Sequence, residues 1–287
     1  MITDSQTNFV YFADTLPIKF RKEYDEITEA LNRHNVSHGL IKGTRDIWCR
    51  DFMPVQVKAQ EFLQFMYYPD YIDTPYLMKG RTNPDDVCGF IEKGRYHLPI
   101  VVDGGNVMKW QDCVVMTSKI FSENPWQPEE LMEALRDQFG VKVIILPWDS
   151  KEIFGHVDSL CRPLPDGGVL FSEVSFFNPD IAKSAENVLD RFFPLIMQFG
   201  FGRTHNQDKL WAYMNYLQTK DVILFPKLSI PEDDEAFKQI KGMFPDYEGS
   251  IEQIDMHRII KCGGALNCIS WNIQSDDESA EDEERAD

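Results

Sequence analysis

The sequence has no long hydrophobic run, and this absence excludes a large class of proteins. None of its apolar segments approaches the roughly 20 residues that a membrane-spanning helix requires. The first residues, MITDSQTNFVYFADTLPIKF, also lack the basic segment and apolar stretch of a secretory signal. We therefore expect a cytoplasmic protein that does not bind a membrane.

Positive charge is scarce in this sequence. Lys and Arg number 29 against 47 Asp and Glu, which gives a formal net charge of −18. Because such a chain repels phosphates, we do not expect nucleic acid as a partner. The end of the sequence, QSDDESAEDEERAD, is rich in acidic residues, and its composition predicts a disordered acidic tail over residues 275–287. The body before the tail is still acidic, which suits a cationic ligand but is equally a common feature of soluble proteins.

The sequence also lacks the paired motifs of common metal sites, because it contains no HExxH and no paired CxxC. Its six cysteines do not indicate a disulfide framework, since that interpretation requires a short secreted chain. We therefore expect reduced thiols, most of them small apolar core residues. The cysteines are Cys49, Cys88, Cys113, Cys161, Cys262 and Cys268.

Segments with helical spacing of apolar residues alternate with short apolar segments that are typical of buried strands. This alternation indicates the α/β class. No linker precedes the acidic tail, so we expect a single domain over residues 1–274. The expected helices are 17–34, 127–139, 180–199 and 231–243, and the expected strands are 99–103, 113–117, 141–147, 168–172 and 221–226.

Polar clusters flanked by glycine recur at a nearly constant period of just over fifty residues. Such a period predicts repeated structural units, each with two or three strands and one helix. Five units that close on themselves would bring all five clusters to one centre. Taking one residue from each cluster gives gaps of 52, 53, 59 and 53 between Asp51, Asp103, His156, Asn215 and Cys268.

The pooled clusters contain a set of residues that suits covalent catalysis by cysteine. Cys268 follows a Gly263-Gly264 pair, which permits a tight turn and close approach to a ligand. His156 can act as the acid and base that a cysteine nucleophile needs, and Asp103 can orient the imidazole ring. Each residue alone also has an ordinary structural explanation, in a turn or in the core.

The other carboxylates suggest what such a site would bind. Asp51 and Asp158 facing one pocket suit a planar cation with several N–H donors, such as a guanidinium group. Trp48 can offer an aromatic face to this cation. The alternative is a divalent metal held by His156, Asp158, Cys268 and another aspartate, and the residues alone leave both possibilities open.

These residues lie in motifs that resemble those of the agmatine deiminase family, which includes the bacterial-type peptidylarginine deiminases. The motifs follow one another in the family's order over most of the chain, which makes the set far more specific than any single motif. They are DIWCRDFMP (46–54), VDGGNV (102–107), GHVD (155–158), WAYMNYLQTKDVILFP (211–226) and GGALNC (263–268).

The resemblance implies the pentein fold, in which five ββαβ units surround a central pocket. It implies that Cys268 is the nucleophile, that His156 is the general acid and base, and that Asp103 pairs with this histidine. It also implies that Asp51 and Asp158 hold the guanidinium nitrogens. It implies Asp46 and Trp48 as further residues that line the pocket. We also expect Asn215, from the fourth polar cluster, to bind the substrate.

The implied reaction is deimination of a small cationic guanidino substrate, without metal or organic cofactor. Agmatine or a related compound would yield a ureido product and ammonia through a covalent amidino intermediate on cysteine. Assembly into a homo-oligomer is compatible with these expectations. Free arginine or peptidylarginine are alternative substrates. An amidinotransferase of the same fold, a metal-dependent hydrolase and a catalytically silent binding protein are alternative functions.

The sequence departs from the family motif around the expected nucleophile. Agmatine deiminases commonly have His where this chain has Asn267. They have Thr-Gln-Gln where this chain has Ser270, Trp271 and Asn272. These departures leave the expected catalytic set intact but concern the part of the pocket that receives the far end of the substrate.

Overall fold

The computed structural model describes residues 1–275, except positions 73, 75–77, 92–93, 173–177 and 202–203. Of the disordered tail expected over 275–287, positions 276–287 lie outside the described residues, whereas the backbone N–H of Ser275 donates to Oδ1 of Asn8 at 2.7 Å. No helix in the described part of the chain has both the length and the apolar character required to cross a membrane.

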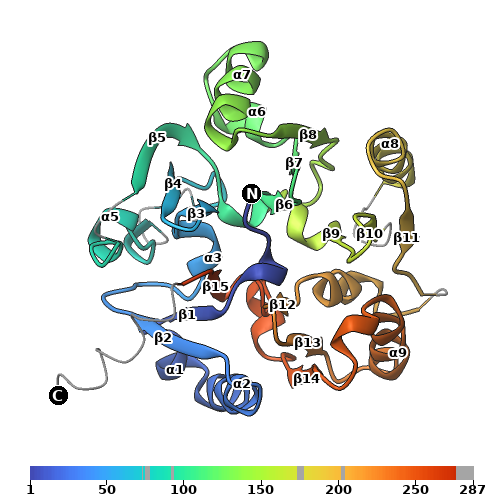
Figure 1. Ribbon diagram of the computed structural model, residues 1–287. Coiled ribbons are helices and arrows are strands. Elements are labelled where there is room, and N and C mark those ends of the chain that lie inside the picture. Colours follow the sequence, from blue (N-terminus) through green and yellow to red (C-terminus); the bar gives the residue numbers. More distant parts are fainter. Residues whose placement is uncertain (73, 75–77, 92–93, 173–177, 202–203, 276–287) are drawn as a thin grey trace.

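The described strands form five three-stranded sheets that are arranged in a ring (Figure 1). In each sheet the first two strands pair antiparallel, and the third pairs parallel with the middle strand after a helical crossover. The sheets are β15 (Ser270–Ile273), β1 (Phe9–Ala13) and β2 (Ser37–Ile41); β3 (Val55–Lys58), β4 (Glu61–Met66) and β5 (Arg95–Val101); β6 (Met108–Lys109), β7 (Cys113–Thr117) and β8 (Lys142–Leu146); β9 (Cys161–Pro163), β10 (Val169–Phe171) and β11 (Ile196–Gln198); and β12 (Leu217–Gln218), β13 (Ile223–Lys227) and β14 (Ile251–Asp255).

The ring is closed by the two ends of the domain. β15 pairs antiparallel with β1, with Phe9 opposite Ile273 and Phe12 opposite Ser270. The last strand therefore completes the first sheet, in the place that β3, β6, β9 and β12 take in the other four. The predicted pentein arrangement of five ββαβ units that close on themselves is confirmed.

The longer helices connect the strands of each unit and lie on the outside of the ring, whereas the short helix α3 lies near its centre and joins the first sheet to the second (Figure 1). α7 shows why the sequence forms such helices: Pro128 occupies its first turn, Leu131 and Leu135 are buried, and Gly140 ends it in a left-handed conformation. The helices are α1 (Leu16–Lys19), α2 (Arg21–Arg33), α3 (Cys49–Phe52), α5 (Pro84–Val87), α6 (Ile120–Glu123), α7 (Pro128–Phe139), α8 (Pro179–Leu189) and α9 (Asp233–Met243), with 3₁₀ turns η1 (Asp4–Gln6), η2 (Gly104–Asn106), η3 (Val157–Ser159), η5 (Gln207–Met214), η6 (Pro245–Tyr247) and η7 (Ile259–Cys262).

Three element predictions were wrong in extent. The helix expected over 180–199 ends at Leu189, because Pro194 cannot continue a helix and the chain instead forms β11, parallel to β10. The helix expected over 17–34 is divided at Phe20, whose φ of −137° interrupts it between α1 and α2. The strand expected over 99–103 belongs to β5, which starts earlier, at Arg95.

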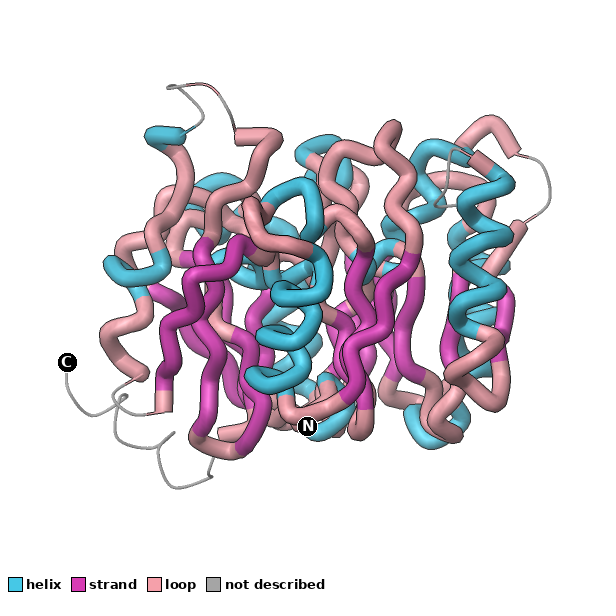
Figure 2. Tube along the Cα trace, turned by 90° about the horizontal axis from the view of Figure 1, so that it is seen from above, coloured by secondary structure: helices cyan, strands magenta, loops and turns pink. Residues whose placement is uncertain are grey.

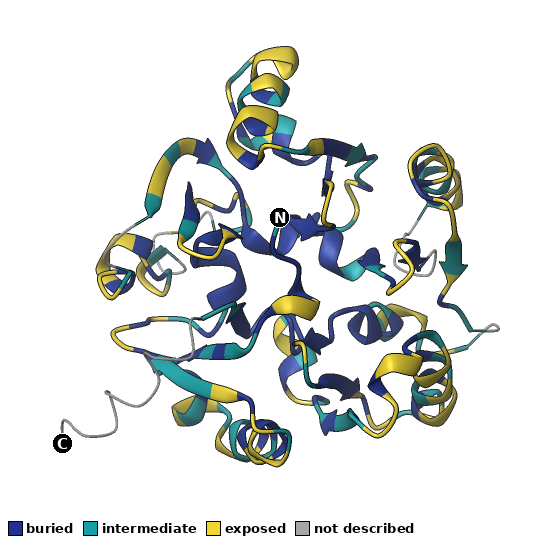
Figure 3. Cartoon of the chain, in the orientation of Figure 1, coloured by how far each residue is buried: buried dark blue, intermediate teal, exposed yellow. Residues whose placement is uncertain are grey.

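The strands run side by side through the middle of the molecule, with loops at both ends of the ring (Figure 2). Buried residues gather on the inner strands, and exposed residues lie on the outer helices (Figure 3). The five polar clusters take equivalent places, because each comes directly before the first strand of a sheet. The pseudo-fivefold arrangement therefore brings them together: Asp51 before β3, Asp103 before β6, His156 before β9, Asn215 before β12 and Cys268 before β15.

Candidate active site

His156 lies between two carboxylates that come from the two preceding units. Its Nε2 is 3.0 Å from Oδ2 of Asp103, and its Nδ1 is 3.7 Å from Oδ1 of Asp51. All three side chains are buried. Burial alone would lower the pKa of His156, but the charge of Asp51 and the hydrogen bond to Asp103 outweigh it and raise this pKa above its ordinary value. The imidazolium form is therefore favoured at neutral pH.

The Asp-Gly-Gly-Asn cluster allows this close arrangement. The backbone N–H of Gly105 donates a hydrogen bond of 2.9 Å to Oδ1 of Asp51. A Cβ atom at position 105 would lie 2.6 Å from Nδ1 of His156 and 2.8 Å from Oδ1 of Asp51. Glycine is required here because only its backbone can approach both side chains so closely.

Cys268 and Asp158 lie together, and Asn215 connects them. The Sγ atom of Cys268 is 3.7 Å from Oδ2 of Asp158. Asn215 donates from Nδ2 to this same oxygen at 2.8 Å, and its Oδ1 accepts from the backbone N–H of Cys268 at 3.1 Å. Asn215 therefore fixes the carboxylate and the cysteine backbone with one side chain.

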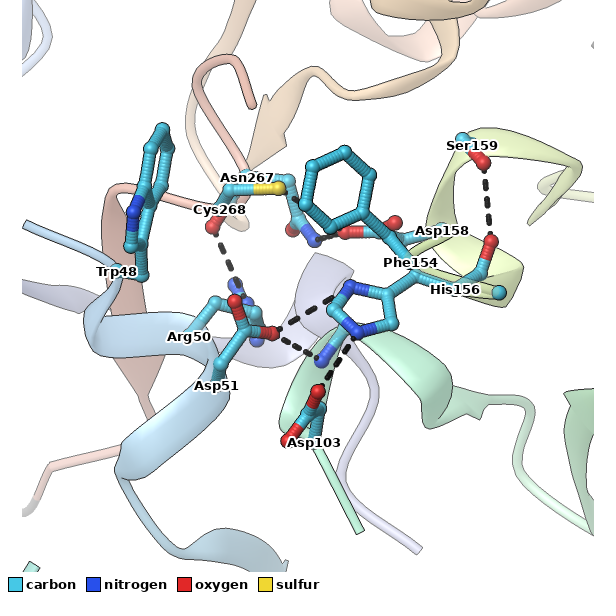
Figure 4. A network of polar contacts seen from close by, with 12 residues as sticks. Trp48, Arg50, Asp51, Asp103, Phe154, His156, Asp158, Ser159, Asn267 and Cys268 are labelled. Carbon is cyan, nitrogen blue, oxygen red and sulfur yellow. Dashed lines mark hydrogen bonds and ion pairs between the residues drawn. The ribbon is translucent and has the colours of Figure 1, made fainter. Parts of the chain in front are cut away.

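Asn267 contacts the same carboxylate. Its Nδ2 donates to Oδ2 of Asp158 at 2.7 Å (Figure 4). The sequence comparison identified Asn267 only as a departure from the family motif, yet the structure brings it into the site as a neutral donor to Asp158.

The environment of Cys268 opposes ionisation of the thiol in the absence of a ligand. Burial raises the pKa of Cys268 well above its ordinary value, and the negative charges of Asp158 and Asp51 raise it further. A cation bound between the two carboxylates would cancel their effect on the thiol. A cationic ligand would therefore remove the part of the shift that the two carboxylates cause, whereas burial would still raise the pKa of this thiol.

Trp48 packs against the loop that carries the cysteine, whereas Asp46 lies behind Trp48. A Cβ atom at position 264 would lie 2.3 Å from Cζ3 of Trp48, so only glycine allows this contact. The carboxylate of Asp46 accepts from the backbone N–H of Trp48 at 2.9 Å and from the N–H and hydroxyl of Thr82, both at 2.8 Å. In this structure Asp46 holds the Trp48 loop.

Two residues that sequence reasoning missed support the site. Arg50 donates from its backbone N–H to the carbonyl oxygen of Cys268 at 3.2 Å, and from Nε to that of Asn267 at 3.3 Å. Tyr71 donates from its hydroxyl to Oδ2 of Asp103 at 3.0 Å. Arg50 stood in a quoted motif and could have been considered, but nothing in the sequence connected Tyr71 to the site.

A cavity of about 420 Å³ opens onto these residues. Its lining includes four of the expected site residues: His156, Asp158, Asn215 and Cys268. The other residues that line it are of mixed character, aromatic, aliphatic, polar and charged. They are Lys151, Glu152, Ile153, Phe154, Ser159, Gln207, Asp208, Trp211, Ile260, Lys261 and Gly263.

A divalent metal site was the alternative that the residue types left open. Among the residues that the structure describes, no group of three or more His, Cys, Asp or Glu side chains is placed to hold a metal ion. All six cysteines are unpaired, and Cys262 is exposed whereas Cys268 is buried.

Known proteins resemble this chain in sequence and in fold. A Shewanella baltica (strain OS223) protein, whose name assigns it provisionally as an agmatine deiminase, is 26% identical over 218 residues, which are 63% of this chain. The chain spans only 58% of the length of that relative in this match. An agmatine deiminase structure from Enterococcus faecalis is 17% identical with a TM-score of 0.73, covering 96% of this chain and 95% of that chain. A C. jejuni agmatine deiminase structure is 15% identical with a TM-score of 0.73, covering 94% of each chain. These structures confirm the fold.

The family assignment comes from a broader match. The family model described as Porphyromonas-type peptidyl-arginine deiminase matches residues 15–273, which include every expected site residue. The chain therefore belongs to the Porphyromonas-type peptidyl-arginine deiminase family.

Proposed function

We propose that this protein is a guanidine deiminase, a hydrolase that converts a linear guanidino compound to its ureido product and ammonia. The observation that carries the proposal is the burial of one thiol, Cys268, beside Asp158 and near His156, which itself lies against Asp51 and Asp103. Agmatine is the first-choice substrate, because the relatives and solved structures reported above carry that name.

The carboxylates Asp51 and Asp158 would bind the guanidinium group of the substrate. A guanidinium is planar and presents N–H donors in a fixed geometry that a carboxylate accepts well. Asn215 and Asn267 hold Asp158 through its Oδ2 atom, so the carboxylate is oriented before the substrate arrives. Water exclusion from this buried site strengthens the attraction for the cation.

Substrate binding would activate the nucleophile. The positive charge of the guanidinium offsets the charges of Asp158 and Asp51, which raise the pKa of Cys268 in the free protein. The thiol then releases its proton to solvent, and the thiolate Sγ attacks the guanidinium carbon, forming a neutral tetrahedral adduct. His156, held as an imidazolium by Asp51 and Asp103, gives its proton to the departing nitrogen, and ammonia leaves.

The second half of the reaction would release the enzyme. The amidino group is now bound to Sγ of Cys268 through a carbon–sulfur bond. The neutral imidazole of His156 takes a proton from water, and the resulting hydroxide attacks the same carbon. The carbon–sulfur bond breaks and Sγ departs as a thiolate. The hydroxyl proton of the adduct passes to this thiolate, which leaves the ureido product and the thiol of the free protein. In this scheme Asp103 orients His156, and Trp48, supported by Asp46, forms a wall beside the Cys268 loop.

We further propose that residues 1–274 form one catalytic domain with an acidic tail over 275–287, and that the protein acts in the cytoplasm. The closure of the ring by β1 and β15 supports the single domain, because neither end of 1–274 completes a sheet without the other.

The test measures ammonia and ureido product from agmatine, free arginine and a blocked peptidyl arginine, each with and without a chelator. Wild type and Cys268→Ala are compared. Turnover of one substrate that survives the chelator and disappears in the variant supports the proposal. Turnover that requires an added amine acceptor would show an amidinotransferase, and turnover that the chelator abolishes would show a metal-dependent hydrolase.

A further inference from the structure

A buried ammonium group lies next to the cavity and takes no part in the reaction scheme. Lys119 is fully buried, and its Nζ donates to the carbonyl oxygens of Ile153 at 2.7 Å and Phe154 at 3.0 Å. It forms an ion pair with Asp70 at 2.9 Å, and Oε1 of Glu123 lies 3.6 Å away. A buried lysine charge is costly in free energy unless it is paired. The two carbonyl oxygens and the carboxylate of Asp70 are therefore held close to this ammonium group.

The loop that Lys119 holds forms one wall of the cavity. Residues 151–154 all line it, and the aromatic ring of Phe154 lies 6.2 Å from the ring of His156 (Figure 4). A Cβ atom at position 263 would lie 2.6 Å from Cζ of Phe154, so this ring also packs against the loop that leads to the nucleophile. Phe154 thus spans the gap between the acid–base residue and the cysteine loop.

Lys119 also contacts Tyr71, which holds the carboxylate of Asp103. Its Nζ lies 4.9 Å from the centre of the Tyr71 ring, and Asp70 is the neighbour of Tyr71 in sequence. The Tyr71 hydroxyl donates to Oδ2 of Asp103, the oxygen that also faces Nε2 of His156. The Tyr71 ring packs edge-on against Phe154, at 5.0 Å between ring centres.

The backbone directly before His156 packs closely against the side chain of Lys119. Gly155 has a φ of +65°, and a Cβ atom there would lie 2.4 Å from Cδ of Lys119. The carbonyl oxygen of Gly155 accepts from the hydroxyl of Thr117 at 2.5 Å. One strand end, Thr117 to Lys119, therefore fixes the three residues that lead into His156.

We propose that Lys119 is a positioning residue of this active site. It joins the cavity loop, residues 151–155, to the turn that contains Asp70 and Tyr71. In this way it fixes Phe154, Asp103 and His156 relative to one another. The effect of Lys119 on kcat rests on the proposed function, because it requires that the protein turns over a guanidino compound. The anchoring of the cavity loop by Lys119 does not depend on that function.

The test compares Lys119→Met with Lys109→Met. Lys109 is a second buried lysine, paired with Asp4 at 3.6 Å, and it is absent from the cavity wall, so its removal controls for general destabilisation. Trypsin cleavage after Lys151 in the ligand-free protein reports loosening of the loop. Cleavage after Lys238, in helix α9, reports global unfolding. We expect Lys119→Met to raise the ratio of the two cleavage rates by roughly tenfold or more, and Lys109→Met to leave it within about twofold.

A kinetic readout completes the test. Lys119→Met should lower kcat by roughly tenfold with a smaller effect on KM, and move the basic limb of the pH–kcat profile, because His156 would lose its fixed partner. If Lys119→Met does not fold, Asp70→Asn replaces it, because Asp70 is the exposed partner of the same ion pair. In Asp70→Asn we expect the cleavage ratio to rise, and kcat to fall, by roughly twofold to fivefold.

The two arms separate the two proposals. An unchanged cleavage ratio and an unchanged kcat in Lys119→Met, or in Asp70→Asn where that variant is used, overturn the positioning role. A wild-type protein that turns over no guanidino compound overturns the proposed function, but the cleavage ratio then still decides whether Lys119 anchors the loop.

Discussion

Asn267 donates a hydrogen bond from Nδ2 to Oδ2 of Asp158, at a distance of 2.7 Å. Asn215 donates to the same oxygen at 2.8 Å, so two neutral amides hold this carboxylate. Both donors are uncharged, so they orient this carboxylate without placing a positive charge beside it. The residue that departs from the family motif thus has a defined place in the site.

Removal of this amide should weaken catalysis. Asn267→Ala deletes a hydrogen bond to a charged group, which is worth about 1.5–3 kcal/mol, so kcat/KM should fall roughly tenfold to hundredfold. Asn267→Asp should be worse, because a second carboxylate beside Asp158 raises the pKa of Cys268 further. Steady-state kinetics on the substrate that wild type accepts provides the measurement. An Asn267→Asp variant with normal kcat/KM would contradict the role given to charge in this pocket.

The pH dependence of activity should follow the pKa shifts of two groups. The pKa of His156 is raised above its ordinary value, so the proton that it gives to the leaving group is lost only as the pH rises through this raised pKa. Burial raises the pKa of Asp51, so its capacity to bind a cation is lost as the pH falls through a value above that of an ordinary aspartate. Activity should therefore be bell-shaped, with a basic limb well above the ordinary pKa of histidine.

Asp103→Asn tests the assignment of the basic limb. The substitution removes a charge and weakens the hydrogen bond that raise the pKa of His156, so the basic limb should move to lower pH and kcat should fall by roughly a hundredfold. Wild type and variant are compared in pH–rate profiles over the same range. A basic limb that stays in place would show that His156 is not the group that titrates there.

Gly105→Ala should damage the site through steric overlap. The added Cβ atom would lie within 2.8 Å of both His156 and Asp51, so these side chains must move apart. We expect a loss of about 1–3 kcal/mol in the free energy of unfolding and a loss of activity of roughly a hundredfold or more. Gly89→Ala is the matched control, because a Cβ atom there meets no atom within 4 Å. Equal effects of the two substitutions in denaturation and kinetics would argue against this explanation.

Trp271, the other departure from the family motif, should matter for stability. It is buried in the core cluster with Phe62 and Tyr67, and its Nε1 donates to the carbonyl oxygen of Pro54 at 2.8 Å. Trp271→Ala should cost about 3–5 kcal/mol of unfolding free energy, measured by chemical denaturation. Trp271→Phe keeps most of the packing and should cost clearly less. Because Trp271 does not line the cavity, substrate preference should be unchanged in Trp271→Phe.

The sequence predicted the five-unit closure because that prediction depended on period and alternation, which the chain carries locally. The cluster residues Asp51, Asp103, His156, Asn215 and Cys268 converge as the period predicted. The helix expected over 180–199 was too long, because the apolar spacing continues past Leu189 although Pro194 forbids the helix. In this segment the apolar pattern favours a helix, but the proline is incompatible with one, and the chain is not helical there.

Tyr71 and Lys119, which support the site, could not be predicted from the sequence for a different reason. Tyr71 reaches Asp103 across 32 positions, and Lys119 reaches Phe154 across 35, from segments without glycine clusters or motifs. Such contacts exist only after the units have packed together. Asp46 shows the converse, because its motif position suggested a pocket residue whereas its oxygens are engaged by Thr82 and the Trp48 backbone.

The central claim is that Cys268 forms a covalent intermediate with a guanidino substrate. The most direct measurement is acid quenching during turnover, followed by intact-mass and peptide mass spectrometry, with Cys268→Ala as the control. The account predicts a substrate-derived amidino adduct on the peptide that contains Cys268, and neither adduct nor turnover in the variant. Undiminished turnover by Cys268→Ala, or an adduct on another cysteine such as the exposed Cys262, would contradict it.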